Sequence, residues 1–125
     1  KDYNVWELQK ALAGKDVLKS NRIINYFESN PKANPIQMVL PSLYSYFSKI
    51  AIYASLPDKR SAAEAMGVNP YVLNDYRLAA GNYSPQKIER IFGYLRDADR
   101  KCKGVGNVSV EDGMLMKELV FKILH

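Results

Sequence analysis

The chain is a short basic polypeptide with the composition of an ordinary globular domain. It has 125 residues, with 18 Lys and Arg against 13 Asp and Glu, and 47% of its residues are hydrophobic. A chain of this length buries about two thirds of the surface that it exposes when unfolded, so it can form a core unaided. One cysteine and one histidine exclude an internal disulfide and a structural zinc cluster, which needs about four ligands. No apolar run approaches the roughly 20 residues of a membrane span.

The N-terminal end predicts a cytoplasmic domain from a longer protein. Residues Lys1 to Glu7 carry no hydrophobic stretch of the signal-peptide type. The sequence begins without a methionine and opens with a polar approach to a helix. No repeat, low-complexity stretch or linker divides it. We therefore expect one domain, residues 1–125, that is a piece of a larger subunit.

Proline, glycine and polar residues divide the chain into helical segments. The pairs Asn34-Pro35, Asn69-Pro70 and Ser84-Pro85 are typical helix starts, because the Asn or Ser side chain accepts from free amides and proline loses no bond there. Apolar residues follow helical spacing, as the core stripe of Leu40, Leu43, Tyr44 and Phe47 does in the third predicted helix, and period-two alternation over a strand length is absent. The sequence predicts an all-α fold with seven helices: Val5 to Ala13, Val17 to Ser29, Pro35 to Leu56, Ala62 to Met66, Pro70 to Ala80, Pro85 to Cys102 and Val110 to Leu124.

Further signals concern the ends and the continuity of these helices. Asn4 with Glu7, and Ser61 with Glu64, have the spacing of a capping box. Pro41 lies about two turns inside the third helix, which is therefore either kinked or split there, and we favour a kink. Four glycines fall just past predicted helix ends, where a left-handed backbone costs glycine least: Gly14, Gly67, Gly81 and Gly104.

The sequence offers no set of side chains with catalytic spacing. The only histidine is the terminal His125, and the only cysteine, Cys102, matches the apolar face of its helix. Two neighbouring lysines would lower the pKa of the Cys102 thiol, but core packing is the interpretation that we favour. The phosphate-binding pattern GxxxxGK[ST] does not occur. We therefore predict a non-enzymatic domain with no cofactor, metal or small-molecule substrate.

The segment from Ser61 to Asn82 has the spacing of a helix-turn-helix. A short helix is followed by a glycine turn and a second helix. A helix that enters a DNA groove presents cations and hydrogen-bond donors, yet here Arg77 is balanced by Asp75, and the segment carries more anions than cations. We favour a helical corner within a bundle. The alternative function is a small helix-turn-helix DNA-binding domain.

Positive charge is concentrated between Tyr83 and Lys103, where six cations face three anions. The excess gathers at the C-terminal end of the predicted helix, and cations there complement the negative end of the helix dipole. The second interpretation is that the same side chains, on adjoining turns, hold a phosphate backbone. We favour the first. The candidate DNA-backbone contacts are Arg96, Arg100, Lys101 and Lys103.

The last predicted helix is apolar on almost every side. Eight of its last eleven positions are hydrophobic: Met114, Leu115, Met116, Leu119, Val120, Phe121, Ile123 and Leu124. In a small domain such a helix is either central or covered by another subunit. The third helix also carries two tyrosines beside its core stripe, and tyrosines often lie half-buried at surfaces. We favour a partner interface, and the residues assigned to it or to the core beneath it are Tyr46, Tyr53, Met116, Leu119, Val120 and Ile123.

Several segments resemble one known family along almost the whole chain. The family is the C-terminal domain of the delta subunit of the bacterial DNA polymerase III clamp loader, in a form like that of Bacteroidetes. The shared features are packing patterns and not catalytic signatures. The segments that resemble it are Trp6 to Leu12, Ala65 to Tyr71, Leu78 to Ser84, Tyr94 to Asp99, Lys101 to Asn107 and Lys117 to Leu124.

This resemblance implies a helical bundle of about five to seven helices, the collar domain, through which clamp-loader subunits associate in a ring. The partners that it implies are subunits of the gamma or tau type and of the delta-prime type. The whole protein would belong to the DNA polymerase III holoenzyme and help to load the sliding clamp in DNA replication. The role expected of this domain is assembly.

The resemblance also places the loop from Gly104 to Ser109, with the cations beside it, near primer-template DNA in the assembled loader. An aromatic residue in such a loop stacks on an unpaired base. This loop carries Val105 and Val108 instead. Contact with DNA is therefore expected only through the cations.

Overall fold

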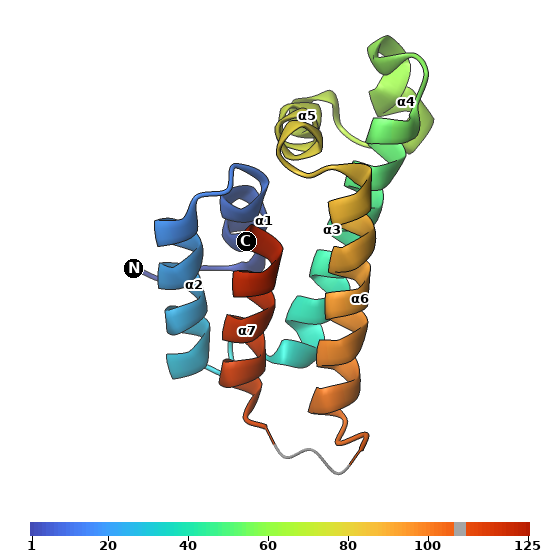
Figure 1. The fold of residues 1–125 in the computed structure, drawn as a ribbon. Helices are drawn as coiled ribbons and strands as arrows, with labels where there is room; N and C mark the ends of the chain where they lie inside the picture. Colours follow the sequence, from blue (N-terminus) through green and yellow to red (C-terminus); the bar gives the residue numbers. More distant parts are fainter. Residues whose placement is uncertain (107–109) are drawn as a thin grey trace.

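Seven α-helices make up most of the described chain, which comprises residues 1–106 and 110–125. In the computed structural model these are α1 (Val5–Ala13), α2 (Val17–Ser29), α3 (Ile36–Ser55), α4 (Ala62–Met66), α5 (Leu73–Asn82), α6 (Pro85–Cys102) and α7 (Asp112–Leu124), with the short 3-10 turns η1 (Lys59–Ser61) and η2 (Pro70–Val72) (Figure 1). The described residues contain no strand, so the predicted all-α class is confirmed. None of their helices has the length and apolar character needed to cross a bilayer.

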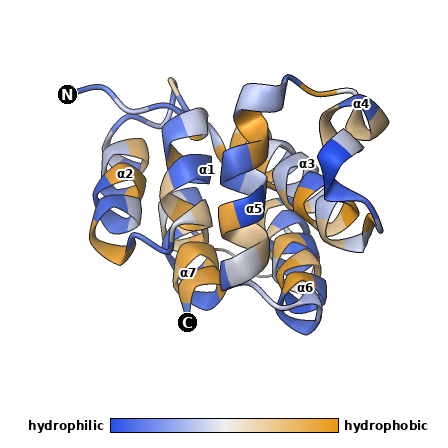
Figure 2. Ribbon diagram, turned by 90° about the horizontal axis from the view of Figure 1, so that it is seen from above, coloured by the Kyte–Doolittle hydropathy of each residue, from blue (hydrophilic) through white to orange (hydrophobic). Residues whose placement is uncertain are grey.

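The helices pack as a bundle with a corner at one end. α7 lies between α2 and α6, and α3 runs antiparallel to α6 (Figure 1). Viewed from above, α5 lies across the end of the bundle between α1 and α3 (Figure 2). All seven helices contribute to one continuous hydrophobic core. This packing buries one side of α3 and α6 and leaves another side of the pair open.

Local capping bonds start three of the predicted segments. The Asn4 side chain accepts from the backbone N–H of Glu7 at 2.9 Å, and the Glu7 carboxylate accepts from the backbone N–H of Asn4 at 3.3 Å. This is the predicted capping box. Asn69 accepts from the N–H of the residue two positions on, and Ser84 from the N–H three positions on, with a proline next to each. Each of these capping bonds joins residues only two or three positions apart, so the sequence alone predicts the helix start.

Two predicted caps are replaced by other interactions. The buried Asn34 side chain donates to the backbone oxygen of Tyr3 at 3.5 Å and does not cap α3. Ser61 makes no side-chain cap bond, because the chain has already turned in η1, where the Asp58 carboxylate accepts from a backbone N–H at 2.9 Å. In both cases a residue outside the predicted helix supplies the competing contact.

The proline and glycine expectations have different outcomes. α3 continues through Pro41, so the helix is not split there. Gly67 ends α4 with φ at +67°, a left-handed conformation that glycine adopts at little cost. Gly81, in contrast, lies inside α5. That helix extends to Asn82, whose side-chain amide donates to the backbone oxygen of Ala13 at 2.7 Å.

Two buried tyrosines differ in the bonding of their hydroxyls. The Tyr83 hydroxyl donates to the backbone oxygen of Leu12 near the end of α1. Tyr46 packs its ring against Phe47 and Tyr76, but its hydroxyl has no hydrogen-bond partner among the described residues. A tyrosine hydroxyl is neutral near pH 7 at its ordinary pKa, and burial raises the pKa of both hydroxyls further. The Tyr83 hydroxyl therefore ties the junction of α5 and α6 to α1, and the Tyr46 hydroxyl is buried without a hydrogen bond to the described part of the chain.

We predict opposite effects when these two hydroxyls are removed. Tyr83→Phe should lower the free energy of unfolding by about 1 to 2 kcal/mol, because a buried hydrogen bond is lost. Tyr46→Phe should leave it unchanged or raise it by up to about 1 kcal/mol, because an unpaired polar group is removed from the core. Urea unfolding measures both. Equal losses in the two variants would contradict the assignment.

Candidate interaction surface

The six residues assigned to an interface or to the core beneath it all lie in the core of this chain. Their exposed fractions range from 0% to 7%: Tyr46, Tyr53, Met116, Leu119, Val120 and Ile123. α2 and α6 cover α7 on two sides, and α5 and α6 pack against α3 (Figure 1). Helices of the same chain therefore occupy the surface that a partner would need. Of the two positions predicted for these residues, an interface or the core beneath it, they occupy the core, and they are inaccessible while the fold is intact.

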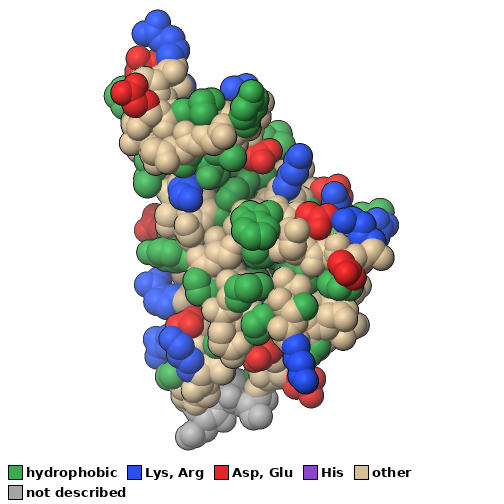
Figure 3. Space-filling model, turned by 180° about the vertical axis from the view of Figure 1, so that it is seen from behind, with side chains coloured by type: hydrophobic (Ala, Val, Ile, Leu, Met, Phe, Trp, Pro, Cys, Tyr) green, Lys and Arg blue, Asp and Glu red, His purple; other side chains and the backbone are tan. Residues whose placement is uncertain are grey.

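Other apolar side chains of the same helices remain exposed. On α7 these are Met114 and Phe121, which is 62% exposed, and on α3 they include Tyr44 and Ile52, exposed by 56% and 49%. Sequence spacing had placed Tyr44 in the core stripe of α3, so it was missed as a surface residue. Figure 3 shows hydrophobic side chains across the middle of the face opposite to that of Figure 1, with charged side chains mainly around them. The apolar surface of the molecule is therefore not fully buried.

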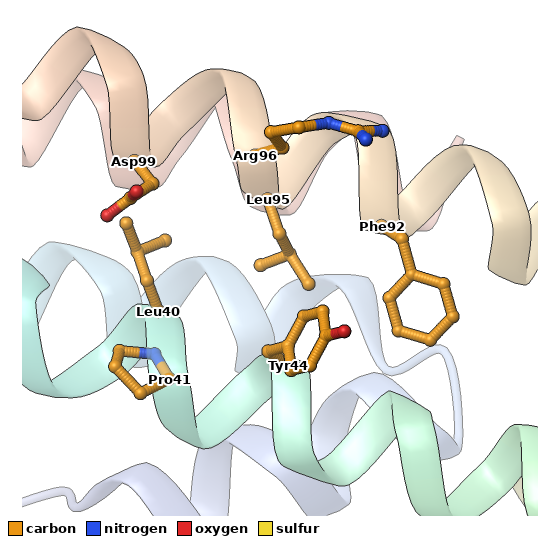
Figure 4. A pocket seen from close by; sticks show the side chains of 7 residues that line it. All are labelled: Leu40, Pro41, Tyr44, Phe92, Leu95, Arg96 and Asp99. Atoms are coloured by element: carbon orange, nitrogen blue, oxygen red, sulfur yellow. The ribbon is translucent and has the colours of Figure 1, made fainter.

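A groove with apolar walls follows the seam between α3 and α6, and we call it the α3/α6 groove. Its larger part has a volume of about 530 Å³ and is lined by Leu40, Pro41, Tyr44, Phe92 and Leu95, with Arg96 and Asp99 at the rim (Figure 4). A smaller hollow of about 260 Å³ continues from Phe92 and is lined by Ala51, Ala54, Ser55, Pro85, Ile88 and Glu89. Phe92 lines both hollows, so the two lie next to each other along the seam.

Two aromatic rings occupy the middle of the α3/α6 groove. The ring centroids of Tyr44 and Phe92 are 5.3 Å apart and the ring planes meet at 52°, which is a favourable aromatic arrangement. Figure 4 shows the rings projecting from the two helices toward each other. The floor beside them is formed by the buried Leu40 and Leu95. An aromatic pair over an aliphatic floor, open to solvent, is the type of surface that protein partners cover.

The four cations predicted to contact the DNA backbone divide into two pairs. Lys101 lies 3.7 Å from a carboxylate oxygen of Glu118 on α7, and Lys103 lies 3.0 Å from one of Asp99. The bond to Asp99 raises the pKa of the Lys103 ammonium group. Arg96 and Arg100 are exposed and form no ion pair within the described residues.

Contact of α6 with DNA therefore stays a prediction, and it concerns mainly two arginines. Both predicted lysines already have partners within the chain, so a phosphate would have to compete with a carboxylate for each. The predicted DNA-facing loop, Gly104 to Ser109, includes residues 107–109, which lie outside the described residues.

The helix-turn-helix spacing corresponds to a corner of the bundle. α4 is followed by the left-handed Gly67, by η2 and by α5, whose Tyr76 and Ala79 are buried against the core. α5 lies over α1 and α3 (Figure 2). Arg77 is exposed on α5, but no second cation lies on that helix. The corner has a packing role, and DNA binding by it stays an untested alternative.

The candidate reactive residues occupy structural positions. Cys102 is half-buried, and its thiol donates to the backbone oxygen of Asp99 at 3.2 Å. Burial, and after it the charge of Asp99, raises the pKa of this thiol, whereas reactive thiols have a lowered pKa. The His125 ring stacks on Phe121 with centroids 4.6 Å apart. Within residues 1–106 and 110–125, no three His, Cys, Asp or Glu residues are grouped so that they could hold a metal ion.

No protein-family model, curated protein or solved structure matches the chain. The resemblance to the clamp-loader delta subunit therefore stays a prediction from sequence.

We predict that the apolar residues of α7 act within the chain. Leu119→Ala should lower the free energy of unfolding of the isolated chain by about 2 to 5 kcal/mol, because it opens a cavity in the core. Phe121→Ala, on the same helix but 62% exposed, should change it by no more than about 0.5 kcal/mol. Thermal or urea unfolding compares the two. A small effect of Leu119→Ala in the isolated chain would contradict the central position of α7.

Proposed function

We propose that the chain is a non-catalytic helical module that binds another protein through the α3/α6 groove. The observation that carries this proposal is the pair formed by the exposed Tyr44 and the half-buried Phe92 over a floor of buried leucines. Leaving such rings in water is unfavourable, and covering them gains free energy in proportion to the apolar area removed. Aromatic side chains in a recess are also the residues that contribute most to binding at protein interfaces.

The assembly that we propose is the clamp-loader ring of bacterial DNA polymerase III, in which this chain is a collar domain. This step is supported by the resemblance of six sequence segments to the delta subunit, and the all-α bundle is compatible with it. The partners would be subunits of the gamma or tau type and of the delta-prime type. In this proposal the domain holds its subunit in the ring, and the N-terminal domain of the whole protein opens the clamp.

We predict that Tyr44→Ala weakens association with these loader subunits by about 1 to 4 kcal/mol, because a central aromatic anchor is removed. Tyr44 is more than half exposed, so the variant should fold normally. The matched control is Phe121→Ala, which removes a similarly exposed ring on α7 and should leave association unchanged. Light scattering of mixtures and calorimetric titration measure the effect, with full-length protein tested in parallel. Equal weakening by both variants would contradict the assignment of the groove.

We predict that the corner formed by α4 and α5 does not bind duplex DNA specifically. A helix-turn-helix domain would show an affinity that falls steeply with salt and depends on the cation of its second helix. Fluorescence anisotropy with a labelled duplex at several salt concentrations should show weak binding that Arg77→Ala does not change. Tight binding that this variant abolishes would favour the DNA-binding alternative.

A further inference from the structure

We propose that the α3/α6 groove binds an amphipathic α-helix of a partner protein, acidic at the end that lies beside Arg96 and Arg100. This inference rests on the proposed function, because it specifies the partner element for the same groove. Three properties of the groove support this proposal: the hydrogen bonding of the backbone in its walls, its length and the charges at its rim.

The walls of the groove favour a helix over an extended segment. Both walls are α-helices, so along most of the groove, away from Pro41 and the helix ends, the backbone N–H and C=O groups are bonded within each helix. An extended peptide on this surface would find no backbone partners and would bury unpaired polar groups against apolar side chains. A helix has its backbone bonds already formed and places apolar side chains at i, i+3, i+4 and i+7 on one face. The groove therefore matches helix-in-groove recognition.

The length of the groove sets the size of the bound helix. Its lining follows α3 from Leu40 to Ser55, which is roughly 22 Å at about 1.5 Å per residue, or four turns. Around Ala51 and Ala54 the wall consists of small side chains, so a helix can approach closely. Around Tyr44 the large rings offer more contact area. A four-turn helix would cover both parts.

The rim charges set the polarity of the bound helix. Arg96 lies along α6 at the edge of the larger hollow (Figure 4), and Arg100 follows one turn later. Asp99 at the same rim is bonded to Lys103 at 3.0 Å, so its charge is offset. The smaller hollow has Glu89 in its lining instead. Acidic side chains of the partner are therefore favoured at the arginine end.

A protein helix fits this surface better than DNA does. Duplex DNA would contact the arginines through phosphates, but its polar backbone would not cover the apolar floor formed by Leu40 and Leu95. An amphipathic helix satisfies both parts of the surface, since its apolar face meets the floor and its acidic end meets the arginines.

Three synthetic peptides test this proposal. Each has about four turns, the same Leu and Ala stripe and the same side-chain staple that holds it helical, and they differ only in two positions at one end: Glu, Gln or Lys. Anisotropy of each labelled peptide titrated with the intact chain measures the dissociation constant. The Glu peptide should bind about 2- to 20-fold more tightly than the Gln peptide, and the Lys peptide should bind most weakly. Tyr44→Ala should weaken all three alike.

Reversing the charge of the rim distinguishes the proposed contact from general attraction to a basic protein. In the double variant Arg96→Glu with Arg100→Glu the order of the three affinities should be reversed. The matched control is Arg22→Glu with Lys32→Glu, which reverses two exposed cations in α2 and the turn after it. This control should keep the original order. If the order of the three peptide affinities does not depend on the two arginines, the acidic end of the helix does not lie beside them and the proposal is overturned.

The other occupants appear as distinct outcomes. Suppose that no peptide binds while loader subunits still associate in a manner that depends on Tyr44. The partner element is then not an amphipathic helix, and the proposed function stands. If the peptides bind as expected but no loader subunit does, the proposed clamp-loader assembly is wrong and the helix-binding site stands. Duplex binding that requires Arg96 and Arg100 and resists competition by the Glu peptide would overturn the inference in favour of DNA. Self-association that Tyr44→Ala abolishes would overturn it in favour of a second copy of the chain.

Discussion

Burial of α7 between α2 and α6 is the constraint on which the rest of the fold depends. The helix is apolar around most of its circumference, and its polar side chains lie where it meets its neighbours. Lys117 forms an ion pair of 2.7 Å with Glu28 of α2, and Glu118 one of 3.7 Å with Lys101 of α6. Gly113 at its start lies so near α2 that an added Cβ would be 2.6 Å from a carbon of Glu28. α7 is therefore held on two sides by other helices of its own chain.

The position of α7 also explains why a groove remains. α7 covers α6 on the side toward α2, while α1 and α5 pack against other parts of α3 (Figures 1 and 2). No helix of the described chain covers the seam of α3 and α6 where Tyr44 and Phe92 meet. Helices α2 and α6 of the same chain bury most of the apolar side chains of α7. The exposed apolar surface that we assign to a partner is the α3/α6 groove, on another side of the bundle. The protein can therefore be stable alone and still have a surface for binding.

Local signals in the sequence were sufficient for most of the secondary structure. Four helices, α1, α2, α4 and α6, have the predicted bounds, because residues such as Asn4 and Ser84 bond to amides within one turn. The errors arose where the deciding contact lay outside the helix. Asn34 bonds to Tyr3, which is distant in the sequence, and Asp58 starts a turn before Ser61 can act as a cap. Capping is predictable when the competing partners are local.

The sequence by itself determined the all-α class, most of the helix boundaries and the absence of a local catalytic pattern, because these depend on neighbours within a few residues. Tertiary structure decided which side of each helix faces solvent. Spacing placed Tyr44 in the core stripe of α3 and Tyr46 beside it, yet Tyr44 is more than half exposed and Tyr46 is buried against Tyr76 of α5. Helical periodicity shows which residues share a face. Which face becomes covered depends on helices far along the chain, and that choice created the groove.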